Sequence, residues 1–120
     1  MYQHVNHATM VTILEEARVP FLTEPFAEDV ATTGLLIAEV NVKYKDQLRL
    51  VDSPLQVTIW TNRLRACDFT LGYEVRSAQA DPDSKPAVIG ETQLATFNIE
   101  RQMLVRIAPH QREYLQRFAR

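Results

Sequence analysis

Near its start the chain places two imidazole side chains and a carboxamide close together, at His4, Asn6 and His7, just before apolar residues with helical spacing. Asparagine is favoured at the N-cap of a helix, because its side-chain oxygen accepts a free backbone N–H of the first turn. The N–H groups that stay free, together with the helix dipole, favour an oxyanion or a polarised carbonyl at the same point. The pattern therefore indicates either a plain helix cap or a site that stabilises negative charge.

The stretch that follows has the pattern of a largely buried helix. Its apolar residues recur at intervals of three and four: Met10, Ile13, Leu14, Ala17 and Phe21. Val11 and Val19 widen this stripe, which predicts burial on nearly every side. Because Pro20 lacks a backbone N–H, we expect the helix to end there.

The rest of the chain alternates between strand patterns and turn residues. A polar connection over residues 23–33 precedes four runs of period two, over residues 36–44, 55–62, 67–75 and 88–101. In the first run the predicted buried face holds Leu36, Ala38, Val40, Val42 and Tyr44. Pro109 suits the first turn of a closing helix. One helix followed by consecutive strands predicts an α+β fold with the helix on one face of an antiparallel sheet, and the short turns favour a meander.

Composition restricts the class of protein. A chain of 120 residues is expected to form a single domain over residues 1–120, and 46% hydrophobic residues can supply a core. A net charge of −2 argues against a nucleic-acid binder that depends on positive charge. Cys67 is the single cysteine, so an intrachain disulfide is impossible. With no signal-peptide pattern and no apolar run of membrane-span length, the sequence predicts a cytoplasmic protein that does not contact the membrane.

The helix start resembles a known motif. Hotdog-fold acyl-CoA thioesterases of the 4-hydroxybenzoyl-CoA thioesterase type commonly read Asp-x-x-Gly-His-Val-Asn-Asn, then an apolar run ending near Glu-Glu-Ala-Arg. This sequence matches at His4-Val5-Asn6 and at Glu15-Glu16-Ala17-Arg18, while Gln3 replaces the glycine and His7 the second asparagine. Gln-His-Val-Asn is also similar to plant acyl-carrier-protein thioesterases. Weaker strand matches extend the resemblance over almost the whole chain.

The resemblance implies a hotdog fold, in which an antiparallel sheet wraps a long central helix and two domains pair with their sheets continuous. It implies hydrolysis of an acyl-CoA to a carboxylic acid and free CoA, without cofactor or metal, by a homodimer or a dimer of dimers. The family's catalytic Asp stands four residues before the motif histidine, a position that falls one residue before Met1. That Asp and the first strand before it are expected to be missing from this chain, through either truncation or true loss.

The same resemblance suggests roles for the residues at the helix. A backbone N–H near His7 would polarise the thioester carbonyl, with His4 and Asn6 lining the pocket. Glu15 falls near the catalytic glutamate of a second hotdog subtype, and if the Asp is truly lost Glu15 is its leading substitute. The structural role is favoured, with an ion pair to Arg18 or exposure to solvent, because Glu-Glu-Ala-Arg also occurs in members of the Asp type.

Three further residues are candidates for substrate binding. Arg63 and Arg65 could bind the CoA phosphates through forked hydrogen bonds. Asp68 is expected either to face the active-site cleft or to pair with one of these arginines.

Two other functions stay open. One is a catalytically silent hotdog domain that binds acyl groups or serves assembly, which true loss of the Asp would explain. The other, a hotdog hydratase, is disfavoured because the sequence lacks that group's Asp-x-Asn-Pro-x-His run. A metal site is disfavoured as well, since His4 and His7 alone supply too few ligands.

Overall fold

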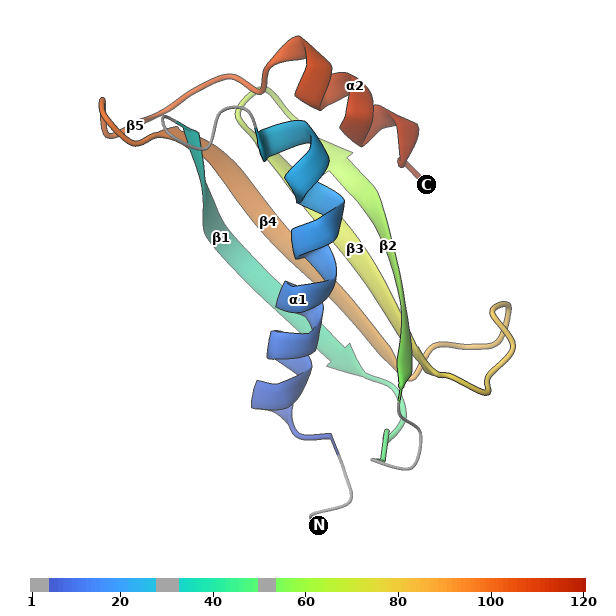
Figure 1. The fold of residues 1–120 in the computed structure, drawn as a ribbon. Coiled ribbons are helices and arrows are strands. Elements are labelled where there is room, and N and C mark those ends of the chain that lie inside the picture. The colour runs from blue at the N-terminus through green and yellow to red at the C-terminus, as the bar shows by residue number, and fades with distance from the viewer. Residues whose placement is uncertain (1–4, 28–32, 50–53) are drawn as a thin grey trace.

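The computed structural model describes residues 5–27, 33–49 and 54–120, in which one long helix lies across a sheet (Figure 1). In chain order the elements are α1 (His7–Phe26), β1 (Thr33–Tyr44), β2 (Leu55–Leu64), β3 (Asp68–Ser77), β4 (Val88–Asn98), β5 (Met103–Leu104) and α2 (Pro109–Arg117). These elements confirm the predicted α+β class. None of the helices in the described ranges is long and apolar enough to cross a membrane.

The sheet is antiparallel with the order β1-β4-β3-β2, and the short β5 adds to β4. The predicted meander is correct for β2, β3 and β4 but wrong for β1, which lies at the opposite edge from β2. The connection after β1 crosses the end of the sheet: the Lys45 and Asp46 N–H groups donate to the Ala87 carbonyl at 2.8 and 3.0 Å. The Val5 N–H donates to the Leu48 carbonyl at 2.8 Å. This crossing brings the residues after β1 next to the start of α1.

Helix α1 continues through both of its prolines, so the prediction that it ends at Pro20 is wrong, and the expected polar connection begins later. A proline removes one intrahelical hydrogen bond and crowds the preceding turn. Pro20 is exposed, as is Glu16, whose carbonyl loses its helical donor, so water can hydrate this acceptor. At Pro25 the freed acceptor is the Phe21 carbonyl, and the Tyr114 hydroxyl of α2 donates to it at 2.6 Å. Helix α2 therefore replaces the donor that the second proline removes.

The inner face of α1 packs on the middle of the sheet. As predicted, the alternating apolar residues of β3 form the floor of the core, and each is fully buried: Phe69, Leu71, Tyr73 and Val75. Gly90 of β4 permits a close approach, because a Cβ at this position would lie 3.0 Å from Leu14 Cδ1. The prediction that α1 is buried on nearly every side is wrong for its flank, where Val19 is exposed.

Strand β1 contains a bulge that changes which residues face α1. The register with β4 shifts between Ile37 and Glu39, so Ala38 is the extra residue. Residues on both sides of the bulge consequently share the α1 side of the sheet: Leu35, Ile37, Val40, Val42 and Tyr44. The prediction that Leu36 and Ala38 belong to this face is wrong, because the bulge reverses the alternation. Nor is the strand half-buried as expected, since Ile37 and Val40 are 51% and 43% exposed.

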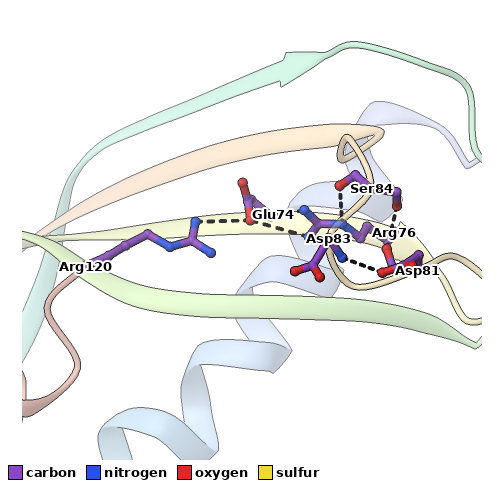
Figure 2. A network of polar contacts seen from close by, with 6 residues as sticks. All are labelled: Glu74, Arg76, Asp81, Asp83, Ser84 and Arg120. Carbon is purple, nitrogen blue, oxygen red and sulfur yellow. Dashed lines mark hydrogen bonds and ion pairs between the residues drawn. The ribbon is translucent and has the colours of Figure 1, made fainter.

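The other face of the sheet carries a polar network, which Figure 2 shows. The Glu74 carboxylate accepts from Nη1 of Arg120 at 3.1 Å and from Nη1 of Arg76 at 3.4 Å. Arg76 Nε donates to the Ser84 carbonyl at 2.9 Å. The Arg120 guanidinium also lies 4.1 Å from the centroid of the Trp60 ring. These contacts hold the loop after β3 and the last residue against the outer face.

Replacing the α2 donor tests why α1 tolerates its second proline. Tyr114→Phe should lower the free energy of unfolding by about 1–2 kcal/mol, because the Phe21 carbonyl then lacks a donor. Urea denaturation followed by circular dichroism measures the loss. In a Pro25→Ala background, residue 25 has an N–H that can donate to the Phe21 carbonyl. Tyr114→Phe should therefore lower the free energy of unfolding by less in that background. An equal cost in both backgrounds would contradict this account.

The pH dependence of this contribution follows from the pKa of the Tyr114 hydroxyl. Burial raises this pKa, the charge of Glu24 raises it further, and the charge of Arg117 opposes them. Because the folded pKa lies above the unfolded value, the stabilisation is present at neutral pH and is lost as pH rises through the raised pKa.

Candidate functional site

The start of α1 is built as the sequence predicts. Asn6 is the N-cap, and its side-chain oxygen accepts the Thr9 N–H at 2.9 Å while its carbonyl accepts the Met10 N–H at 2.9 Å. The first two N–H groups of the helix, those of His7 and Ala8, have no intrahelical acceptor. The start of α1 therefore presents two donors at the positive end of a 20-residue helix.

A cavity of about 630 Å³ opens at this end of the molecule, between the start of α1 and the end of β1. Its lining residues are Val5, His7, Met10, Tyr44, Asp46, Gln47, Leu48 and Val88. Apolar side chains from α1, β4 and the crossing segment form much of the wall, while a few polar groups stand among them. An apolar wall with a small number of polar groups is typical of a small-molecule site.

A side-chain hydrogen bond joins the two elements that flank this cavity. His7 Nδ1 lies 2.6 Å from the Tyr44 hydroxyl, and the two rings meet edge to face. Partial burial raises the pKa of the Tyr44 hydroxyl above its usual value, which already lies well above neutral pH, so the group is protonated. The phenol therefore sets the orientation of the imidazole at the start of the helix.

Asp46 supplies the carboxylate of this cavity, and among its described lining residues it is the only one. The bond from its backbone N–H to the Ala87 carbonyl holds the residue in place. Its Oδ1 accepts the Gln47 N–H at 2.8 Å. Sequence reasoning missed Asp46, and it took Tyr44 only as a strand residue, because no local pattern shows that the connection after β1 passes the start of α1.

The residues predicted on α1 are distributed over two places. His7 lines the cavity at the helix start and Asn6 caps the helix, while His4 lies outside the described residues. Glu15, about two turns further along, lines a different cavity together with Arg18. Glu15 is exposed, and the described contacts include no ion pair between it and Arg18. One chain therefore does not bring Glu15 and His7 to the same cavity.

The residues predicted to bind substrate phosphates lie at the end of the sheet away from His7, around the turn between β2 and β3 (Figure 1). Arg65 Nε donates to Asp68 Oδ1 at 2.9 Å, and Gln93 Nε2 donates to the same oxygen at 3.1 Å. Burial by itself would raise the pKa of Asp68. The hydrogen bonds from Arg65 and Gln93, with the charges of Arg65 and Arg63, instead bring this pKa below its usual range. Of the two roles expected for Asp68, the ion pair with an arginine is therefore present.

The structure was also searched for side chains that could together bind a metal ion. Across residues 5–27, 33–49 and 54–120 there is no group of three or more His, Cys, Asp or Glu side chains placed to hold a metal ion.

Comparison with known proteins gives a family and a fold. A sequence profile described as the thioesterase-like superfamily matches residues 1–117. A search of curated proteins gave no match. Among solved structures, YbaW, a probable thioesterase from Escherichia coli, has a TM-score of 0.81 at 22% identity, covering 100% of this chain and 90% of that protein.

Two proteins from Staphylococcus aureus are also similar. SAV2348, solved in complex with CoA, has a TM-score of 0.81 at 14% identity, covering 98% of this chain and 74% of its own. A DHNA-CoA thioesterase has a TM-score of 0.77 at 17% identity, and the match covers 96% of this chain and 78% of that protein. At these identities the neighbours establish the fold alone, and they confirm the predicted hotdog arrangement.

Proposed function

Because the chain belongs to the thioesterase-like superfamily, we propose that it hydrolyses an acyl-CoA to a carboxylic acid and free CoA at the cavity beside the start of α1. Family membership supports thioester hydrolysis in general. The CoA portion of the proposal is supported by the neighbour solved with CoA and by the DHNA-CoA thioesterase. The observation that carries the proposal is the opening of a mainly apolar cavity at the free N–H groups of α1.

The helix start would stabilise the charge that develops during hydrolysis. In the proposed pose the thioester carbonyl oxygen accepts the N–H of His7, and the acyl chain lies against Met10, Leu48 and Val88. When water attacks the carbonyl carbon, negative charge moves onto this oxygen. Preorganised backbone donors and the positive end of the helix dipole stabilise such an oxyanion more than they stabilise the neutral carbonyl.

Asp46 is the proposed base for the attacking water. Its carboxylate takes one proton from water as the new C–O bond forms, and the C–S bond then breaks with the electron pair leaving on sulfur. The proton held by Asp46 passes to the CoA thiolate, which balances the reaction. The Tyr44 hydroxyl holds the His7 ring in position beside the reacting group. Glu15 stays the alternative base, although within one chain it lines the other cavity.

Paired substitutions at His7 test the backbone donor. His7→Ala keeps the N–H and should change kcat modestly, whereas His7→Pro deletes it and should lower kcat by ~10²–10³, the loss seen for one oxyanion donor. Proline is tolerated at the first helical position, so the helix should survive. Decanoyl-CoA hydrolysis followed by thiol release gives the rates, with circular dichroism as the folding control. Wild-type activity in His7→Pro would exclude this donor, and a collapse in His7→Ala alone would make the imidazole the reacting group.

Substitution of the two candidate carboxylates identifies the base. Asp46→Asn should lower kcat by ~10²–10⁴, the usual contribution of a general base, while Glu15→Gln should leave at least a third of the activity. The two variants remove the same charge from exposed positions, so each is the control for the other. The reverse ranking would assign the base to Glu15. A wild-type chain that binds decanoyl-CoA without hydrolysing it would favour the silent acyl-binding domain instead.

We also propose that two copies pair along β1 and the uncovered flank of α1, as a homodimer or within a dimer of dimers. Exposed apolar side chains follow this surface: Val19, Ile37 and Val40. The edge of β1 has no strand beside it among the described residues, and such edges readily pair with a second chain. In one chain Arg63 and Arg65 lie at the end of the sheet away from His7. If they bind the CoA phosphates, the thioester of that CoA must therefore lie in the cavity beside α1 of a second copy.

Light scattering tests this assembly. The wild type should have at least twice the chain mass of 13.8 kDa at micromolar concentration. Val40→Glu should give a monomer, because it places a charge at the pairing edge. Met103→Glu, a matched change at an exposed apolar residue of β5, should keep the wild-type mass. A monomeric wild type, or a Val40→Glu variant that still pairs, would argue against this surface.

A further inference from the structure

The hydrogen bond between His7 and Tyr44 also decides which nitrogen of the imidazole carries the proton. The bond joins His7 Nδ1 to the Tyr44 oxygen at 2.6 Å, and either group can donate or accept. A phenol is a stronger acid than the N–H of a neutral imidazole, and an imidazole nitrogen is a stronger base than a phenol oxygen. The hydroxyl therefore donates and Nδ1 accepts. Because a neutral imidazole has one N–H, that proton lies on Nε2.

The Nε2–H group of this imidazole is available to a ligand. Among the described residues, Tyr44 is the one that bonds to the His7 ring and meets it edge to face. Its bond occupies Nδ1, and Nε2 lies on a different edge of the ring. His7 and Tyr44 both line the cavity beside the start of α1. The tautomer therefore makes the imidazole a side-chain donor at this cavity, in addition to the backbone N–H groups.

The exposed fractions of the lining side chains place this imidazole at the mouth of the cavity. In the proposed pose the acyl chain lies against Met10, Leu48 and Val88, which are 1%, 6% and 1% exposed. Tyr44 is 46% exposed, and His7 is exposed as well. With the acyl chain on the buried wall and the carbonyl at the His7 N–H, the thiol arm of the substrate leaves on the exposed side, where the imidazole lies.

The thiol arm of CoA carries a group that an Nε2–H can bind. Two carbons after the sulfur it has an amide, whose carbonyl oxygen is a neutral acceptor. In the other tautomer Nε2 would itself be an acceptor, and two acceptors cannot form a hydrogen bond. The carboxylate of Asp46 lines the same cavity and opposes a negatively charged acceptor. A neutral amide carbonyl therefore fits this donor better than a carboxylate or a phosphate does.

We propose that Tyr44 is a positioning residue, whose hydroxyl holds His7 in the tautomer that donates from Nε2 to the first amide carbonyl of the thiol arm. The inference rests on the proposed thioesterase function and adds how the leaving group is recognised. The amide takes no part in the bond changes, so this hydrogen bond stabilises the bound substrate and the transition state alike. Such uniform binding lowers KM and leaves kcat nearly unchanged.

Nitrogen-15 NMR of the side chains reads the tautomer in the protein without substrate. At about pH 8, where an imidazole of ordinary pKa is neutral, His7 of the wild type should carry its proton on Nε2. Tyr44→Phe removes the donor to Nδ1 and should give a mixture of the two tautomers. The matched control is Tyr73→Phe, which deletes a buried hydroxyl without a partner among the described residues and should keep the wild-type tautomer. A proton on Nδ1 in the wild type, or an unchanged tautomer in Tyr44→Phe, would overturn the proposal.

Two model thioesters test recognition of the amide. The butanoyl thioester of N-acetylcysteamine keeps this amide, whereas that of ethanethiol ends at the second carbon. The ratio of their kcat/KM values should fall ~3–10-fold in His7→Ala and in Tyr44→Phe, mainly through KM, as expected for one neutral hydrogen bond. His7→Gln presents an amide N–H that has no tautomer, so it should keep the ratio, and adding Tyr44→Phe to it should change nothing. An equal ratio in wild type and Tyr44→Phe would refute the role of Tyr44.

A thioether probe separates this inference from the proposed function. S-Butyl-N-acetylcysteamine has the amide of the thiol arm but no bond that a thioesterase can hydrolyse. It should shift the Nε2 resonance of His7 in the wild type, and butyl ethyl sulfide, which lacks the amide, should not. No shift with the amide probe would overturn the inference, even in a chain that hydrolyses thioesters. A shift in a chain that hydrolyses neither model thioester would refute the proposed function alone.

Discussion

The width of a single helix limits what the sheet can bury, and the rest of the structure follows from where that helix lies. Helix α1 packs on β3 and β4, where Gly90 leaves room for Leu14. A helix is about 10 Å wide, whereas strands are spaced at nearly 5 Å. One helix therefore cannot cover four strands, and β1 stays largely open on its α1 side. Both cavities described above lie on this side, one at each end of β1.

The length of α1 is a second constraint, and it depends on a residue far along the chain. If the helix ended at Pro20, Leu22 and Phe26 could not continue the stripe that packs on the sheet. The hydroxyl of Tyr114 supplies the donor that Pro25 removes, and edge-to-face contacts between Phe21, Tyr114 and Phe118 hold α2 at that place. The closing helix therefore stabilises the part of α1 that forms the wall of the second cavity.

Charge is arranged unequally along the uncovered side of α1. Free N–H groups, the His7–Tyr44 pair and the Asp46 carboxylate meet at the first cavity. At the second cavity the polar side chains are those of Glu15, Arg18 and Thr23. Because both cavities have mainly apolar walls, these few groups decide which part of a ligand each one can hold. A thioesterase needs donors where the carbonyl lies, and the start of a helix supplies them without a catalytic side chain.

Local patterns in the sequence were sufficient for the features that depend on neighbouring residues. Asn6 caps α1 because capping involves residues three positions apart, and the alternation of Phe69 to Val75 predicts a strand with one buried face. The motif at His4 to Asn6 indicated the family, and the profile match confirmed it. The place of His7 at the candidate site could therefore be predicted without coordinates.

Tertiary structure alone decided the features that depend on contacts distant in sequence. The continuation of α1 past its prolines requires Tyr114, a donor 93 positions from its acceptor. The bulge at Ala38 reverses the faces of β1, because an alternating pattern carries no sign of an inserted residue. Asp46 reaches the cavity only because the connection after β1 passes the start of α1, and Arg18 is buried only because its face of α1 packs on the sheet. A periodic pattern records which side of an element is apolar, but which element covers that side is determined when the chain folds.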